Sequence, residues 1–201
     1  MPPLTEEERR ILLGLAREAL EMGVRGGALN EGIPALPPAL LASQGAFVTL
    51  QKQDRLRGCI GHVRGDAPLY RTVRECAVGA AIADPRFPPV TLEEVSSIHI
   101  EISVLSEPQV VSPEQVEVGK HGLFIWQGRW RGLLLPQVAV EWHWDREKFL
   151  EQTCLKAGLP EDAWRHGATV EAFTAQVFGE DPGSATSASE TGNSFHPVRA
   201  R

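Results

Sequence analysis

The short segment Arg55–Gly61 has a second copy at Arg129–Leu135, and this repeat constrains the fold more than any other feature of the chain. Both copies carry the pattern Arg-x-Arg-Gly, and each follows an apolar run, Phe47–Gln51 in the first case and Leu123–Gln127 in the second. Two apolar runs joined by a short polar turn are typical of a β-hairpin. The repeat therefore predicts one hairpin in each of two related halves.

The spacing of apolar residues predicts the other elements. Thr5 and Glu8 have the spacing of a capping box, so a helix should begin there. Apolar and polar residues alternate along Ser97–Leu105, which is typical of a strand with one buried face. In the second half, a helix is expected over 145–157 and a closing strand over 170–178.

We expect one domain over residues 1–180, with the two internal repeats at about 46–105 and 122–178. After Gly179 the chain is rich in Ser, Ala, Thr, Gly and Glu without apolar periodicity. Such a composition buries too little apolar surface to offset the entropy of ordering. Residues 181–201 are therefore predicted to form a disordered tail.

Composition excludes several classes of partner. The formal net charge is -6, and no cluster of Lys and Arg offsets it, so we expect no nucleic-acid partner. No apolar run reaches the roughly 18 residues of a membrane-spanning helix, so we expect no membrane insertion. The N-terminus lacks the pattern of a secretory signal, and the count of three cysteines is odd. These features predict a cytoplasmic protein with reduced thiols.

Five motifs in a fixed order carry a resemblance to a known family. They are Leu56–Gly61, Asp84–Pro89, Glu101–Leu105, Gly119–Leu123 and Leu133–Ala139. Over roughly residues 5–180 the chain resembles the AMMECR-one domain family, which includes system protein A of the AmmeMemoRadiSam gene trio.

The resemblance implies an α+β fold. Its duplicated β-β-β-α-α-type repeats would form a single curved, barrel-like, mostly antiparallel sheet with flanking helices. The resemblance also implies work beside a radical-SAM enzyme and a Memo-type protein. An accessory role in a modification pathway is the expectation that follows.

Cys59 is the first candidate for a catalytic residue. Strand alternation places Arg57 and Cys59 on one face, where a guanidinium favours thiolate over thiol. Gly58 and Gly61 leave room for a ligand to approach. Two observations favour a structural role instead, since free cysteines are often buried and the second copy has Leu133 at the matching position.

Five further residues are candidates for a site around Cys59. Arg86, oriented by Asp84, could bind an anionic group of a ligand together with Arg57, or Asp84 and its neighbours could simply stop a helix. Glu101 projects from the polar face of its strand and could move a proton, as could the loop histidine His121. Gln137 could offer an amide to a ligand. For each of these residues a structural role remains open.

Two functions follow from these candidates. In one, the chain is an enzyme that acts on a small molecule or a modified residue with Cys59 as nucleophile. In the other, it is a binding module for a small molecule or peptide. The histidines, cysteines and carboxylates lack metal-binding spacing, so we expect no metal site, and no motif names a cofactor.

Overall fold

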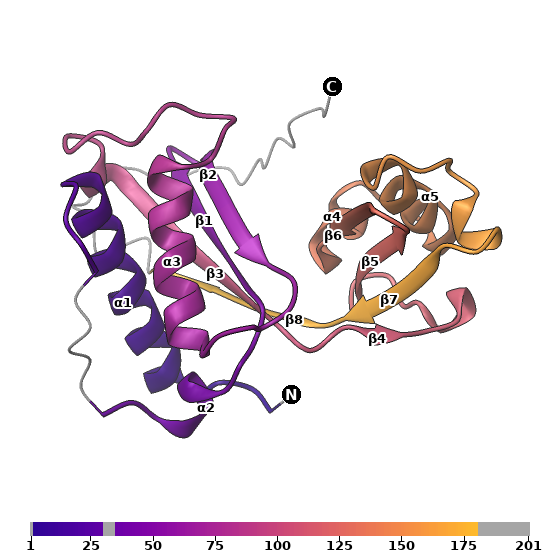
Figure 1. The fold of residues 1–201 in the computed structure, drawn as a ribbon, viewed down its shortest axis with the longest axis horizontal. Helices are drawn as coiled ribbons and strands as arrows, with labels where there is room; N and C mark the ends of the chain where they lie inside the picture. The colour runs from indigo at the N-terminus through magenta and orange to yellow at the C-terminus, as the bar shows by residue number, and fades with distance from the viewer. Residues whose placement is uncertain (1, 30–34, 181–201) are drawn as a thin grey trace. The chain divides into compact units, whose positions relative to one another are not determined.

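The computed structural model describes residues 2–29 and 35–180, and within them the chain forms two compact units (Figure 1). The first unit extends to Val104 and resumes at Gln176, while the second is Leu105–Ala175. Residues 181–201, for which the sequence predicts a disordered tail, lie outside the described residues.

The first unit is a four-stranded sheet with helices on one face. Its elements are α1 (Glu6–Val24), α2 (Pro38–Leu41), β1 (Ala46–Lys52), β2 (Arg55–His62), α3 (Leu69–Ile82), β3 (Ile98–Leu105) and β8 (Ala175–Gly179). The strand order is β2-β1-β3-β8, and β1 pairs antiparallel with both β2 and β3. Helices α1 and α3 pack side by side, and α3 also contacts β1 and β2 (Figure 1).

Alternation explains which face of this sheet is covered. Val48 and Leu50 of β1 and Ile100 and Ile102 of β3 are fully buried in the core that α1 and α3 complete. Burying such side chains stabilises a fold by about 1.5–3 kcal/mol each. The residues between them therefore project to the opposite face.

Helix α1 begins as the sequence predicts. The Glu8 backbone N–H donates to Thr5 Oγ1 at 3.2 Å, and the Thr5 backbone N–H donates to the Glu8 carboxylate at 2.8 Å. The capping box is thereby confirmed, and it satisfies donors that a helix start leaves unpaired.

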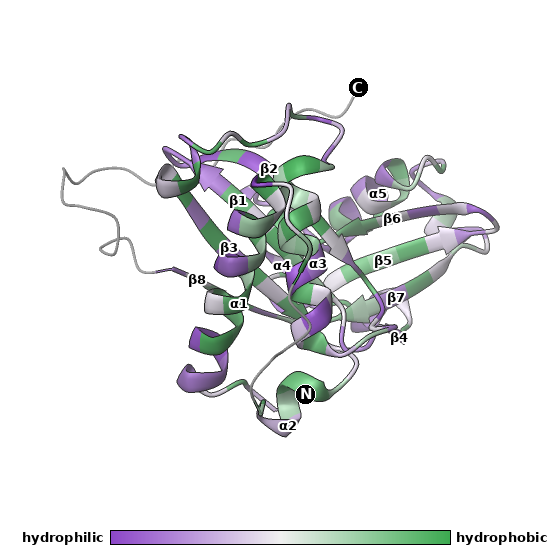
Figure 2. Cartoon of the chain, turned by 60° about the vertical axis from the view of Figure 1, so that its left-hand side comes forward, coloured by the Kyte–Doolittle hydropathy of each residue, from purple (hydrophilic) through white to green (hydrophobic). Residues whose placement is uncertain are grey.

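The second unit has its own sheet and core. Its elements are β4 (Gln109–Val110), β5 (Gly122–Gln127), β6 (Trp130–Leu134), α4 (Pro136–Glu141), α5 (Arg146–Lys156) and β7 (Thr169–Phe173). The strand order is β4-β7-β5-β6. Leu123 and Ile125 of β5 are buried against Phe149 and Leu150 of α5. In the hydropathy colouring of Figure 2, green hydrophobic residues lie in the strands of both units.

The two units use their hairpins in the same way. In each, the first hairpin strand pairs with the second and also with a later strand, β1 with β2 and β3, and β5 with β6 and β7. A Cβ on Gly58 would lie 2.1 Å from the Ala80 carbonyl oxygen, and one on Gly132 would lie 2.3 Å from the Ala157 nitrogen. The glycine of each Arg-x-Arg-Gly copy therefore permits close contact with a later helix, α3 in the first unit and the C-terminal end of α5 in the second. Descent of the halves from one ancestor stays a prediction.

The α+β class is confirmed, but the expected single barrel-like sheet is wrong. The strands form two separate four-stranded sheets. The order along the chain is β1-β2-α3-β3 in the first unit, where β8 completes the sheet, and β4-β5-β6-α4-α5-β7 in the second. The predicted closing strand, 170–178, is divided at Thr174 into β7 and β8, which belong to different sheets. Each sheet thus completes its own core. No helix of residues 2–29 and 35–180 is both long and apolar enough to cross a membrane.

Candidate functional site

Cys59 lies in a row of three side chains on the first sheet. In the antiparallel register, Cys59 is opposite Thr49, and Thr49 is opposite Glu101. Directly opposed residues project to the same face of a sheet. Because Gly58 contacts Ala80 of α3, its neighbour Cys59 points the other way. The row therefore lies on the face away from α3.

The environment of the thiol keeps it protonated. The Thr49 hydroxyl donates to Cys59 Sγ at 3.4 Å, and the side chain of Cys59 is partly buried. Burial raises the pKa of Cys59, although the Thr49 hydrogen bond and the charge of Arg86 act to lower it. A thiolate is the reactive form of cysteine, so this thiol is a weak nucleophile at neutral pH.

Asp84 is a buried carboxylate that binds four donors. Its Oδ1 accepts from the Arg86 backbone N–H at 3.0 Å and from Arg86 Nε at 2.9 Å. Its Oδ2 accepts from Arg86 Nη2 at 2.7 Å and from the Cys59 backbone N–H at 2.8 Å. The Arg86 guanidinium, helped by the two backbone donors, lowers the pKa of Asp84 to about 2. Asp84 is therefore ionised at neutral pH.

Asp84 and Arg86 together satisfy the backbone of Cys59. Strand β2 is at the edge of its sheet, where backbone groups lack a partner strand. The Cys59 N–H donates to Asp84, and the Cys59 carbonyl accepts from Arg86 Nη2 at 3.2 Å. We call Cys59, Asp84 and Arg86 the edge clamp. The side chain of Arg86 is 48% exposed, so it also presents charge at the surface.

Arg57 does not contact the thiol, contrary to the sequence-based expectation. Its Nε and Nη2 donate to the Glu94 carboxylate at 3.2 and 2.9 Å, and its Nη1 and Nη2 donate to the carbonyls of Pro88 and Pro89. Arg57 and Lys52 lower the pKa of Glu94 to about 2. Arg57 thus holds a loop in place, and the guanidinium beside Cys59 is that of Arg86.

The glycines of this motif are covered by protein atoms. A Cβ on Gly61 would lie 2.2 Å from the ring of Phe47, its partner across the hairpin. Gly58 faces the backbone of α3 at Ala80. The space that the sequence suggested for a ligand at these two positions is therefore filled by packing.

Of the proton-transfer candidates, Glu101 is in the row with Cys59, and burial raises the pKa of its carboxyl. His121 and Gln137 belong to the second unit. The Glu117 backbone N–H donates to His121 Nδ1 at 3.1 Å, so one ring nitrogen of this histidine is used in a hydrogen bond within its own loop. Gln137 is partly buried in the first turn of α4.

Sequence reasoning missed Glu171, which occupies in the second unit the place of Glu101 in the first. Glu171 is opposite Phe124, and Phe124 is opposite Leu133, the residue that matches Cys59 in the repeat. The carboxylate is only 4% exposed and accepts a hydrogen bond from Trp126 Nε1 at 3.1 Å. Aligning the strands after each hairpin would have paired the two glutamates.

A family model described as AMMECR1 matches residues 13–178. The chain belongs to the AMMECR1 family. This match confirms the resemblance inferred from the five motifs, and it spans every residue of the edge clamp. Among residues 2–29 and 35–180, this AMMECR1 chain has no group of three or more His, Cys, Asp or Glu side chains that could hold a metal ion.

Archaeal proteins are similar over nearly the whole chain. A protein of Methanothermobacter thermautotrophicus is 46% identical over 188 residues, which covers 89% of this chain and 97% of the relative. A protein of Methanosarcina acetivorans is 44% identical over 186 residues, or 88% and 94% of the two chains. The crystal structure of an uncharacterized protein of Pyrococcus horikoshii is similar with a TM-score of 0.83 and 41% identity, covering 89% and 94%.

Proposed function

We propose that this AMMECR1 chain is a ligand-binding, accessory component of a modification pathway. The observation that carries the proposal is the edge clamp. The two charged groups beside Cys59 are bonded to each other and to the Cys59 backbone, so neither is poised to remove the proton of the thiol. A nucleophilic cysteine needs such a base or a lowered pKa.

The row of Cys59, Thr49 and Glu101 supports binding in a second way. Burial raises the pKa of both the thiol and the Glu101 carboxyl, which favours their neutral, hydrogen-bonding forms. The ligand is a small molecule or a peptide segment that meets this row and the guanidinium of Arg86. We propose a radical-SAM enzyme and a Memo-type protein as the partners, because the family resemblance implies them.

Co-purification tests this proposal. The full chain is co-expressed with the radical-SAM and Memo-type proteins of its own genome, and both assembly and pathway turnover are measured. Cys59→Ser should leave both unchanged, whereas Arg86→Ala should reduce assembly about 10-fold, since it removes a charged contact. Arg55→Ala, an exposed residue on the same strand, is the matched control. Wild-type assembly of Arg86→Ala would refute this version of the proposal.

The alternative is an enzyme with Cys59 as nucleophile. Thr49 donates to the sulfur, and both this bond and the charge of Arg86 favour the thiolate, although burial outweighs them. If Cys59→Ser abolishes pathway turnover while assembly stays at the wild-type level, the nucleophile is supported and the purely accessory role is not.

A further inference from the structure

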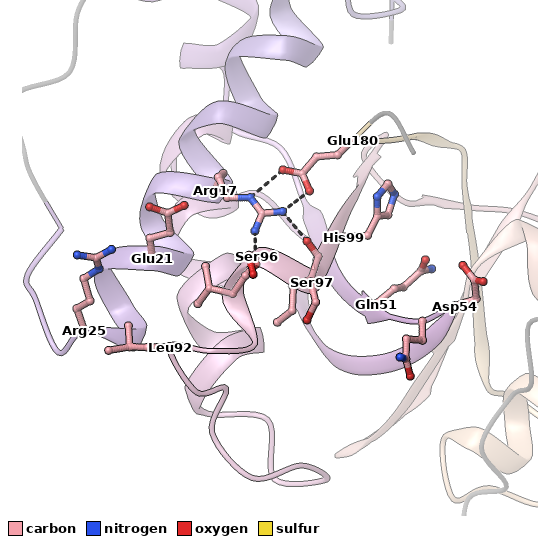
Figure 3. Close-up of a pocket in the computed structure, with 13 residues that line it drawn as sticks. Arg17, Glu21, Arg25, Gln51, Asp54, Leu92, Ser96, Ser97, His99 and Glu180 are labelled. Carbon is pink, nitrogen blue, oxygen red and sulfur yellow. Dashed lines mark hydrogen bonds and ion pairs between the residues drawn. The ribbon is translucent and has the colours of Figure 1, made fainter. Parts of the chain in front are cut away.

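A cavity of about 910 Å³ lies within the first unit and shares no residue with the edge clamp. Its walls are the C-terminal half of α1, the turn between β1 and β2, the segment Leu92–His99 and Glu180 (Figure 3). Ligand cavities typically have volumes of about 300–1,000 Å³. The cavity is therefore large enough for a small ligand.

One ion pair is built into the wall. Arg17 of α1 donates two hydrogen bonds to Glu180, and it also donates to the carbonyls of Val95 at 3.0 Å and Ile98 at 2.7 Å (Figure 3). These bonds join α1, the start of β3 and the end of β8. Arg17 and Glu180 neutralise each other, so they hold the wall in shape and leave recognition of a charged ligand to other residues.

The remaining charges lie at separate ends of the cavity. Arg25, with Glu21 one helical turn before it, is at the α1 end, while Asp54 is at the hairpin end beside Gln51 (Figure 3). One arginine against two carboxylates disfavours a polyanion such as a nucleotide. A ligand with a negative group at one end and a positive group at the other matches this arrangement.

Neutral polar and apolar side chains also line the cavity. Gln51 and His99 are opposed across β1 and β3, and both project into the cavity. Gln51 can donate to and accept from a peptide group through its amide. Leu92 and Val95 add apolar surface to the lining. An amide, an imidazole and apolar side chains in one lining suit a short stretch of peptide backbone.

We propose that this cavity binds a short peptide with free ends. The guanidinium of Arg25 binds the terminal carboxylate, and the carboxylate of Asp54 binds the terminal ammonium group. The Gln51 amide binds a peptide group between them. The ligand class is thus a zwitterionic di- to tetrapeptide. The site shares no residue with the row that contains Cys59, although Gln51 and His99 are the opposed pair next to Thr49 and Glu101 on β1 and β3.

Triglycine and its blocked forms test the assignment by NMR titration of the full chain at millimolar peptide. Saturable shifts of the His99 ring are expected with triglycine. Asp54→Asn should weaken triglycine about 10-fold and leave N-acetyl-triglycine unchanged, since the latter has no ammonium group. Arg25→Gln should weaken N-acetyl-triglycine by a similar factor and leave triglycine amide unchanged.

The variants are chosen to keep the fold. Asp54 has a φ of 58°, a conformation that asparagine adopts readily, so Asp54→Asn preserves the turn. Arg10→Gln, exposed on the same helix as Arg25 and outside the cavity, is the control and should bind like the wild type. Three results would overturn the proposal. They are the absence of a saturable shift with triglycine, an equal loss of affinity of each variant for the blocked and unblocked peptides, and tighter binding of inorganic phosphate than of triglycine. None of them bears on the function proposed for the edge clamp.

Discussion

The carboxylate of Asp84 accepts a 2.8 Å hydrogen bond from the backbone N–H of Cys59, which lies 25 residues earlier in the chain. Helix α3 lies between the two residues in the sequence, so this bond joins strand β2 to the turn that follows α3. The same contact protects an edge strand from pairing with another chain. The motif that suggested a ligand-binding arginine therefore also has a clear structural task.

Asp84→Asn should lower the free energy of unfolding by about 2–3 kcal/mol. The replacement puts an amide donor where four donors now converge, and bonds to a charged acceptor are worth about 1.5–3 kcal/mol. Urea denaturation measures the change. Asp66→Asn, at an exposed carboxylate, should be within about 0.5 kcal/mol of the wild type. Equal stability of the two variants would contradict the clamp.

The stability of the chain should fall in acid because of the same residue. The folded pKa of Asp84, about 2, is below its ordinary value of 3.8, so the ionised form stabilises the fold. That contribution is complete above about pH 4 and is lost as the pH falls through 2. The difference in unfolding free energy between the wild type and Asp84→Asn should therefore shrink by about 2 kcal/mol from pH 5 to pH 2. A difference that stays constant with pH would rule out ionised Asp84 as its source.

Local signals in the sequence predicted the parts of the fold that depend on neighbouring residues. The box of Thr5 and Glu8 was confirmed, as were both hairpins, because turn and cap patterns are local. The predicted helix over 145–157 is α5, with Asp145 accepting from the Lys148 backbone N–H. The spacing of residues along the sequence was enough to predict these elements.

The site was harder to predict because it depends on the pairing register of the strands and on contacts between segments that are far apart in the sequence. The pairing of β1 with β2 shifts between Leu50 and Gln51, so strand alternation counted from Cys59 fails at Arg57. The bonds of Arg57 to Glu94 connect segments 37 residues apart. The break at Thr174 likewise follows from the sheets to which β7 and β8 belong. None of these has a signature in the local sequence.

Alanine at the two repeated glycines should be strongly destabilising. A Cβ on Gly58 or Gly132 would meet helix backbone at 2.1 or 2.3 Å, and backbone atoms cannot move aside as a flexible side chain can. We expect a loss of about 3 kcal/mol for each, measured by thermal unfolding. Gly14→Ala is the control, because nothing lies within 4 Å of its added Cβ in α1, and it should stabilise by about 0.5–1 kcal/mol. Tolerance of Gly58→Ala would show that β2 and α3 are not in close contact.

Alkylation of Cys59 should be faster than that of Cys76 or Cys154 but should still require alkaline conditions. Cys59 is partly buried and the other two are buried, with the pKa of Cys76 raised to about 12. The rate of Cys59 labelling, followed by peptide mass spectrometry, should rise with pH through a midpoint above the ordinary thiol value of 9.0.

Arg86→Gln should slow this labelling about 3-fold at pH 8, because the guanidinium lowers the pKa of the thiol and its loss raises that pKa further. Thr49→Val should act in the same direction, since the hydroxyl bond to sulfur also favours the thiolate. Arg55→Gln is the control on the same strand and should label like the wild type. A midpoint below pH 8 in the wild type would instead identify Cys59 as an activated nucleophile, and the alternative enzymatic function would then be favoured.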